Sequence, residues 1–303
     1  MSEWALLVGQ IYNGLSVASI LLLAAIGLAL SFGFMRVINM AHGEFLMFGG
    51  YLAYLSYQLL PGPMYVFVAL ALGFLGAALL GGVLELLLIR HLYRRSLDTL
   101  LATWGVSLIF QQLARNLFGP TGVAVTAPSW LSGTFTVESG PLSGLVLPHV
   151  RLFVIGFTVL ILAVLYLLLQ NTKIGLYVRA VNQDREIAES LGVHTRWIDF
   201  LVFSLGSGLA GLAGATLALI APVTPTVGQS YIVDAFLVVI LGGIGSLSGT
   251  ALASVLVGLV SATLQTFTSV SFAKVILLVL VIGFLQCRPR GLIATRSREL
   301  KEV

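Results

Sequence analysis

Three polar side chains stand close together in an otherwise apolar stretch, Ile38–Phe45: Asn39, His42 and Glu44. A charged carboxylate inside a membrane costs at least about 2.5 kcal/mol, so Glu44 is expected to face the interior of a helix bundle or water. Counted from Arg36 at about 1.5 Å per helical residue, Glu44 would lie roughly 12 Å deep. Two roles remain open for His42: a structural hydrogen-bond partner of Glu44, or a group that lines a polar pathway.

A second unusual segment, Leu241–Gly249, contains too many glycines for a regular membrane helix. It predicts an interrupted helix whose backbone groups border a cavity, because such breaks are tolerated only where protein or water satisfies them. A sharp turn that joins two helices is the alternative. On the first interpretation, the pathway candidates in this segment are Gly242, Gly243, Gly245 and Ser246.

A third segment, Lys173–Asp199, holds 8 of the 28 Asp, Glu, Lys and Arg residues. Within it, apolar side chains recur at helical spacing, and acidic residues favour the positive end of a helix dipole. The pattern predicts one short amphipathic helix in the cytoplasm, and a helix that simply lies on lipid headgroups is the alternative. The apolar positions are Val181, Ile187, Ala188 and Leu191, the acidic ones are Asp184 and Glu186, and Gly192 marks the end of the helix.

The composition identifies the protein class that these segments belong to. The chain is 58% hydrophobic and 9% charged, with a mean hydropathy of +1.03, which leaves too few polar residues to cover a soluble globule of 303 residues. Charge-free runs such as Trp4–Met35, of 32 residues, exceed the roughly 20 that cross a bilayer. We therefore expect an all-α, polytopic transmembrane bundle of about 8–9 spans with broken or re-entrant helices. The expected spans are 5–34, 38–60, 64–89, 99–115, 152–170, 198–221, 232–247, 250–268 and 272–287.

The spans and the basic residues together predict a topology for one transmembrane domain, 1–303. Thirteen of the sixteen Lys and Arg residues fall on one side, which the positive-inside rule assigns to the cytoplasm. The C-terminus is then cytoplasmic, and an odd number of spans puts the N-terminus outside. We expect an extracytoplasmic loop at 116–150, a cytoplasmic coupling loop at 171–197 and a cytoplasmic tail at 288–303. The first span is expected to be retained rather than cleaved as a signal.

The sixth expected span carries two rows of small residues at four-residue spacing. Such rows allow close approach of helix backbones in lipid, so we interpret them as a helix–helix interface rather than a substrate site. The rows are Gly206, Ala210 and Gly214, and Ser207, Gly211 and Ala215.

Enzyme chemistry finds little support in the sequence. A single cysteine, Cys287, excludes an internal disulfide and a cysteine-built metal site, and the four histidines are scattered. No GxSxG, HExxH or GxxxxGK[ST] motif is present, so no hydrolase site and no nucleotide-binding loop is expected. We therefore expect no metal, no cofactor and no catalytic residue in this chain, and its basic charge needs no nucleic acid.

Four motifs in order, VINMAHGEFLMFGGY, RAVNQDREIAESLGV, LVVILGGIGSLSGTALASVLVG and RPRGL, together resemble the permeases of branched-chain amino-acid-type ABC importers. The resemblance covers nearly the whole chain. In that superfamily a cytoplasmic loop of pattern EAA, three residues and Gly docks on the ATPase, and this chain has Ile in place of one Ala. The coupling residues that the resemblance implies are Arg179, Asp184, Arg185, Glu186, Ala188, Leu191 and Gly192.

The resemblance also implies partners and a mechanism. Two cytoplasmic ATPases holding Mg-ATP, an external solute-binding protein and a second homologous permease would act with this chain by alternating access in a bacterial inner membrane. The segments 99–120, 229–236 and 287–292 are more similar to the urea branch of the family, so urea is the predicted substrate and a branched-chain amino acid the alternative. The pathway would offer Asn39, Thr103 and Ser107 as hydrogen-bond partners. An ion-coupled secondary transporter is a more distant alternative.

Overall fold

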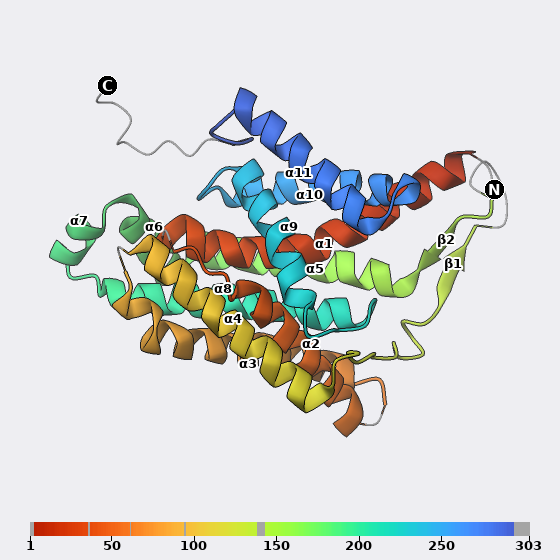
Figure 1. Ribbon diagram of the computed structural model, residues 1–303, viewed down its shortest axis with the longest axis horizontal. Coiled ribbons are helices and arrows are strands. Elements are labelled where there is room, and N and C mark those ends of the chain that lie inside the picture. The colour runs from red at the N-terminus through yellow and green to blue at the C-terminus, as the bar shows by residue number, and fades with distance from the viewer. Residues whose placement is uncertain (1–2, 36, 61, 94, 138–142, 294–303) are drawn as a thin grey trace.

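A computed structural model describes residues 3–35, 37–60, 62–93, 95–137 and 143–293, which form a bundle of helices with one short hairpin (Figure 1). The sequence-based fold class, a polytopic helical bundle, is confirmed. The helices are α1 (Glu3–Met35), α2 (His42–Leu59), α3 (Tyr65–Leu87), the 3-10 turn η1 (Ile89–His91), α4 (Ser96–Phe118), α5 (His149–Asn171), α6 (Lys173–Gln183), α7 (Arg185–Ser190), α8 (Thr195–Ala218), α9 (Val227–Gly242), α10 (Leu247–Phe267) and α11 (Val270–Cys287); the strands are β1 (Thr134–Thr136) and β2 (Val146–Pro148).

Each of the nine expected spans corresponds to a helix. Among the described residues, six helices are long and apolar enough to cross a membrane, namely α1, α3, α5, α8, α10 and α11, and α9 is a shorter apolar helix. The second expected span begins later than predicted, because residues 37–39 are not helical and α2 starts only at His42. The depth estimate for Glu44, which assumed a helix from Arg36, therefore does not apply. Arg36 itself lies outside the described residues.

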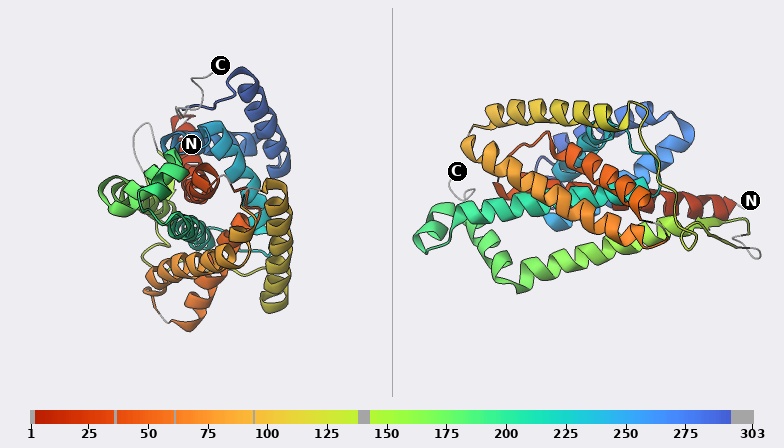
Figure 2. Two further views of the ribbon diagram at one scale, coloured as in Figure 1. Left: turned by 90° about the vertical axis from the view of Figure 1, so that its left-hand side faces the viewer. Right: turned by 90° about the horizontal axis from the view of Figure 1, so that it is seen from below.

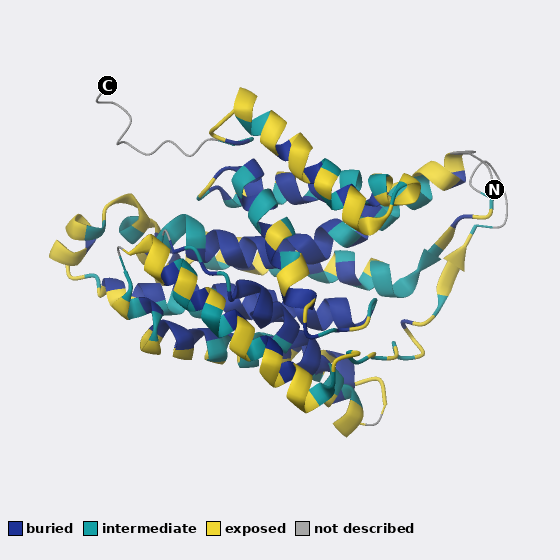
Figure 3. Cartoon of the chain, in the orientation of Figure 1, coloured by how far each residue is buried: buried dark blue, intermediate teal, exposed yellow. Residues whose placement is uncertain are grey.

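Helices α1 and α8 form the centre of the bundle (Figure 3). In their most apolar 18-residue windows, 83% and 78% of the residues are buried, against 17% for α11, which lies at the periphery. The two rows of small residues on α8 explain its central position, since they let three neighbouring helices approach its backbone. The prediction of a helix–helix interface at these rows is confirmed.

Glycine is required at three positions of α8 by the distance to the next helix. A methyl group at Gly214 would lie 1.8 Å from the carbonyl oxygen of Leu46 on α2, and one at Gly211 would lie 2.1 Å from that of Gly73 on α3. A methyl group at Gly206 would meet Gly27 of α1 at 2.5 Å. Side chains cannot separate these backbones, so α1, α2 and α3 are held in contact with α8 by van der Waals packing.

The two ends of the bundle differ in character (Figures 1 and 2). One end carries η1, α6 and α7, and the other carries the antiparallel pair β1–β2, in which Phe135 lies opposite Leu147. The β-hairpin belongs to the stretch predicted as an extracytoplasmic loop, although α4 runs on to Phe118 before that loop begins. The start of α1 and the end of α11 lie at opposite ends, as an odd number of spans requires.

The glycine-rich segment 241–249 is a turn between two helices. Helix α9 ends at Gly242, α10 begins at Leu247, and Gly243 and Gly245 adopt φ of 102° and 84°, which side chains disfavour. The interpretation as an interrupted helix is wrong, and the alternative of a sharp turn is confirmed. The carbonyl of Gly242 accepts a hydrogen bond at 3.1 Å from the amide of Ile293, so the chain returns from α11 to cover this turn.

Replacing Gly214 by Ala tests the packing around α8. The added methyl group cannot fit without moving α2, and overpacking of this kind costs about 1–3 kcal/mol or more. We expect a fall of roughly 5 °C or more in the melting temperature of the detergent-solubilised protein. Gly156→Ala on α5, where an added methyl group meets nothing within 4 Å, is the matched control and should change it little. Equal melting temperatures for the two variants would contradict this packing.

Candidate functional site

The polar residues of segment 37–44 lie inside the bundle, where the chain turns from α1 into α2. Asn39 and Glu44 are 0% and 1% exposed. The Asn39 side-chain oxygen accepts a hydrogen bond at 3.0 Å from the amide of Ala41, which shapes the turn before α2. Residues 37–39 are not helical, so this turn separates α1 from α2.

Glu44 is held from α4 rather than from its own neighbours. One carboxylate oxygen accepts hydrogen bonds from the Ser107 hydroxyl and the Gln111 amide, both at 2.9 Å. The other carboxylate oxygen and the Asn39 amide nitrogen are buried and have no hydrogen-bond partner among the described residues. One acceptor and one donor therefore remain available in the same region, and leaving such groups unpaired is costly.

His42 does not bond to Glu44, so its interpretation as the partner of that carboxylate is wrong. Its Nε2 atom lies 3.0 Å from the carbonyl oxygen of Ala24 and donates to it, which ties the start of α2 to α1. The ring also packs edge-on against Phe45. In this structure His42 is a structural residue of the α1–α2 contact.

Helix α4 contributes a buried polar stripe. Thr99, Thr103, Ser107 and Gln111 recur every four residues, so they share one helix face, and all are at most 6% exposed. Thr103 accepts a hydrogen bond at 3.1 Å from the amide of Met40. Thr99 and Gln111 were not among the sequence candidates, although their four-residue spacing could have identified them beside Thr103 and Ser107.

The first turn of α9 lies against the first turn of α2, near Glu44. A methyl group at Gly43 would lie 2.2 Å from the carbonyl oxygen of Gly228, so the beginnings of α2 and α9 touch through their backbones. The glycines at the other end of α9 do not join this cluster, because they form the α9–α10 turn. The pathway candidates of this turn therefore lie apart from those around Glu44; they are Gly242, Gly243, Gly245 and Ser246. Ser246 has a local role instead, since its side chain caps α10 by accepting a hydrogen bond from the amide of Gly249 at 3.0 Å.

The charged segment 173–199 forms two short helices, α6 and α7, and the first turn of α8, instead of one helix. The break is at Asp184, whose side chain caps α7 by accepting from the amide of Ile187 at 3.0 Å. Val181 therefore belongs to α6, contrary to the prediction. Within α7, Ala188 is buried, whereas Ile187 is 58% exposed.

The end of α7 matches the predicted position. Gly192 has a φ of 86°, as expected for a residue that terminates a helix. Leu191, just before it, is 79% exposed. The helix thus turns two apolar side chains, Ile187 and Leu191, and the acidic Glu186 outward.

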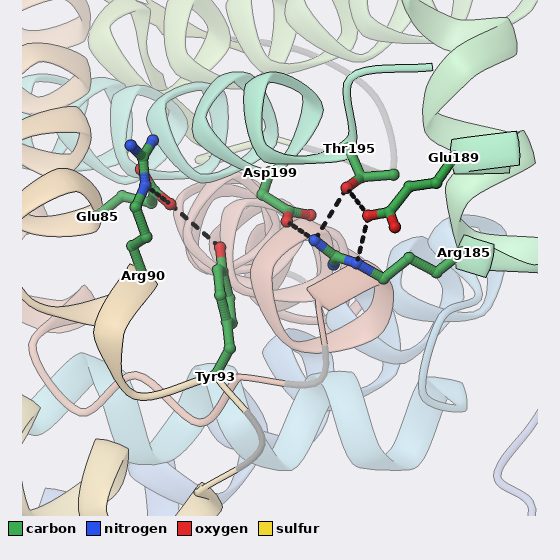
Figure 4. Close-up of polar contacts among 7 residues, drawn as sticks. All are labelled: Glu85, Arg90, Tyr93, Arg185, Glu189, Thr195 and Asp199. Atoms are coloured by element: carbon green, nitrogen blue, oxygen red, sulfur yellow. Dashed lines mark hydrogen bonds and ion pairs between the residues drawn. The ribbon is translucent and has the colours of Figure 1, made fainter. Parts of the chain in front are cut away.

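Arg185 fastens α7 to α8 (Figure 4). Its guanidinium donates to a carboxylate oxygen of Asp199 at 2.7 Å and to the Thr195 hydroxyl at 3.2 Å, and it lies 3.6 Å from Glu189. Burial would lower the pKa of Arg185, but the hydrogen bond and charge of Asp199 outweigh it, and the pKa is raised. Arg179, on α6, donates to the carbonyl of Leu169. These two coupling candidates therefore bind their own chain.

Tyr93 connects this cluster to α3 (Figure 4). Its ring lies under the Arg185 guanidinium, 5.7 Å from the ring centre, and its hydroxyl donates to Glu85 at 3.2 Å. Glu85 is fully buried and also forms an ion pair with Arg90 at 3.2 Å. Burial, then the charges of Asp199 and Glu85, raise the pKa of Tyr93, so the phenol keeps its proton and remains a donor.

A cavity of about 940 Å³ opens beside the cluster. Its walls come from the end of α1, from the connection between α3 and α4, and from α6 and α7. At its mouth lie exposed residues such as Gln183 and Glu186, and farther in lie the buried residues Val37 and Thr99. Among the described residues, no group of three metal-binding side chains comes together.

Comparison with known proteins gives one family and several full-length relatives. A family model described as branched-chain amino acid transport system / permease component matches residues 10–285. The chain is 28% identical to the high-affinity branched-chain amino acid transport system permease protein BraD of Pseudomonas aeruginosa over 94% of each protein. It is 27% identical to LivH of Salmonella typhimurium, again over 94% of each. A probable branched-chain amino acid permease LivH of Methanocaldococcus jannaschii is 26% identical over 94% of this chain and 92% of that protein. No solved structure matches significantly.

Replacing Glu44 tests the contact between α2 and α4. Glu44→Ala leaves the Ser107 and Gln111 donors without their acceptor, which costs about 1–3 kcal/mol. Glu44→Gln retains a carbonyl oxygen in the same place and should cost much less. We expect a clearly lower melting temperature for the Ala variant alone. Similar melting temperatures for both variants would show that this acceptor does not hold α4.

Proposed function

The chain belongs to the family of permease components of branched-chain amino acid transport systems, and from this premise we propose that it is the translocation subunit of an ATP-driven importer of aliphatic amino acids. The observation that carries the proposal is the family match, which extends from the second turn of α1 to the last turn of α11. The chain is a multi-pass membrane protein and a transport subunit rather than an enzyme.

We propose leucine, isoleucine or valine as the substrate in place of urea. The full-length relatives are named for branched-chain amino acids, and they favour this alternative over the urea prediction. The unpaired groups are also suited to an amino acid. A zwitterion needs an acceptor for its ammonium group and a donor for its carboxylate, and the free oxygen of Glu44 and the amide nitrogen of Asn39 are such a pair.

Energy for transport would come from partner subunits. The chain has no nucleotide-binding loop, and we propose that one of two ATP-binding subunits docks on α7 at the exposed side chains Glu186, Ile187 and Leu191. A solute-binding protein would deliver substrate at the end that carries β1 and β2, and a second homologous permease would complete the transporter. This assignment puts α7 and the C-terminus in the cytoplasm and the N-terminus outside a bacterial inner membrane.

Coupling to an ion gradient is less well supported. The charged groups that could serve it inside the bundle are Glu44, Glu85, Asp234 and Lys274. Glu44 binds α4 through Ser107 and Gln111. Glu85 is paired with Arg90, and Asp234 forms an ion pair with Lys274 at 2.8 Å, which joins α9 to α11. These charges serve the contacts between helices, and the docking helix α7 has no evident use in an ion-coupled carrier.

Deleting the gene for this chain tests the substrate. We expect the deletion strain to lose high-affinity uptake of radiolabelled leucine and to keep urea uptake, with restoration of leucine uptake by a plasmid copy. Loss of urea uptake with normal leucine uptake would return the chain to the urea branch.

Reversing one charge on α7 tests ATPase docking. Glu186→Lys is exposed and should leave the membrane level of the protein unchanged, yet reduce ATP-dependent uptake at least about tenfold by opposing the docking contact, equivalent to 1.4 kcal/mol. Asp98→Lys, at an exposed acidic residue of the same end outside α7, is the matched control and should transport normally. Normal uptake with Glu186→Lys would place the docking contact elsewhere.

A further inference from the structure

Two buried acids lie at the end of the bundle that carries α7. The side chain of Glu85 on α3 is 0% exposed, and that of Asp199 on α8 is 4% exposed. Each carboxylate is matched by one arginine, Glu85 by Arg90 at 3.2 Å and Asp199 by Arg185 at 2.7 Å. Removing one partner of such a pair leaves a buried charge uncompensated, which costs far more than losing an ion pair on the surface. The position of each arginine is therefore fixed by its acid.

Arg185 joins three parts of the chain (Figure 4). From α7 its guanidinium reaches the Asp199 carboxylate and the Thr195 hydroxyl of α8. It also lies over the ring of Tyr93, in the connection between α3 and α4, and the Tyr93 hydroxyl donates to Glu85. A planar guanidinium can make two directed hydrogen bonds and stack on an aromatic ring at the same time, whereas the ammonium group of a lysine is a point charge. The arrangement therefore uses the specific geometry of arginine.

The connection of α7 to α6 is different. The two helices meet at Asp184, whose backbone is extended, with φ of −157° and ψ of 111°. Within the part of the chain that the structure describes, no side-chain hydrogen bond or ion pair joins α7 to α6, whereas α7 and α8 are joined by Arg185 and by the hydrogen bond from Thr195 to Glu189. The polar contacts thus attach α7 to α8.

The proposed docking face of α7 is separate from the face that is attached to α8. Ile187 and Leu191 are 58% and 79% exposed and lie four residues apart, on one side of the helix. Arg185 and the buried Ala188 lie three residues apart, on the side turned to the bundle. A change of Arg185 therefore alters the attachment and leaves the docking face intact.

From this arrangement we propose that Arg185 and Asp199 are positioning residues that make α7 and the centre of the bundle one mechanical unit, with Tyr93 as the link to α3. The inference rests on the proposed transport function and adds how a docked ATP-binding subunit acts on the bundle. Because α1, α2 and α3 pack on α8 through their backbones, a displacement of α7 is passed to all of them. Arg185 then serves inside this chain and is not a contact to the ATP-binding subunit.

The amount of leucine imported per ATP hydrolysed tests the role of Arg185. The complete importer, with its ATP-binding subunits and solute-binding protein, would be reconstituted in proteoliposomes and supplied with radiolabelled leucine. In Arg185→Gln we expect the ATP-binding subunits to stay bound and to hydrolyse ATP, while leucine import per ATP falls at least about tenfold. Arg95→Gln is the matched control and should import normally, because the ion pair of Arg95 with Asp98 is exposed on both sides.

Two results would overturn the proposal. One is a normal ratio of import to ATP hydrolysis in a fully assembled Arg185→Gln importer. The other is loss of the ATP-binding subunits from this variant, since Arg185 would then belong to the docking contact itself.

A double variant keeps the test decisive if Arg185→Gln does not fold because Asp199 is left unpaired. Arg185→Gln combined with Asp199→Asn removes both charges, so no buried acid is left uncompensated. The glutamine side chain is too short to cover Tyr93, and we expect the same fall in import per ATP at an unchanged melting temperature. A normal ratio in the double variant would contradict the proposal.

A distance measurement separates this inference from the substrate assignment. Spin labels at Ser190 on α7 and at Leu79 on α3, both exposed, would be introduced in a Cys287→Ser background, because Cys287 is the single native cysteine. With Arg185 and Asp199 in place, we expect ATP to leave the distance between the labels unchanged. In the double variant ATP should change it.

A distance that changes with ATP as much in the presence of Arg185 and Asp199 as in the double variant would refute the mechanical unit. The expected pair of distances together with no leucine import would retain the unit and refute the amino acid assignment. Failure of ATP-binding subunits to copurify with the unchanged chain would refute the proposed function, and this inference with it.

Discussion

The close packing of backbones around α8 is the constraint on which the rest of the structure depends. In lipid, helices gain no hydrophobic stabilisation from meeting one another, so contact area at short range has to hold them. Glycines at positions 206, 211 and 214 bring α1, α3 and α2 against α8 without intervening side chains. That rigid centre fixes where α2 begins, and hence where Glu44 lies.

Around the rigid centre the peripheral helices are held by different interactions. Helix α4 meets segment 37–44 through a polar stripe, and α11 joins α9 through the Lys274–Asp234 ion pair. Polar contacts of this kind are directional and exchangeable, whereas interlocked backbones are not. The bundle therefore combines a centre held by backbone contacts with peripheral helices held in part by polar side chains.

The two regions of functional interest are physically linked at one end of the bundle. Arg185 anchors α7 to α8 and covers Tyr93, which bonds to the buried Glu85 of α3. The cavity at this end is lined by the same α7 residues and by Thr99 of α4. Helix α7 is thus fixed to α8, and through Tyr93 to α3, beside this cavity.

The sequence by itself determined the membrane class, the nine helical segments and the interface role of the small residues on α8, because these follow from local composition and from periodicity along one helix. It also indicated Glu44 as a buried acid. Only the tertiary structure decided which groups meet it, since Ser107 and Gln111 are more than sixty residues away and the direction of a buried side chain depends on the neighbouring helix. The same reason explains why His42 turned toward Ala24, and why the glycines after α9 proved to be a turn covered by the returning chain.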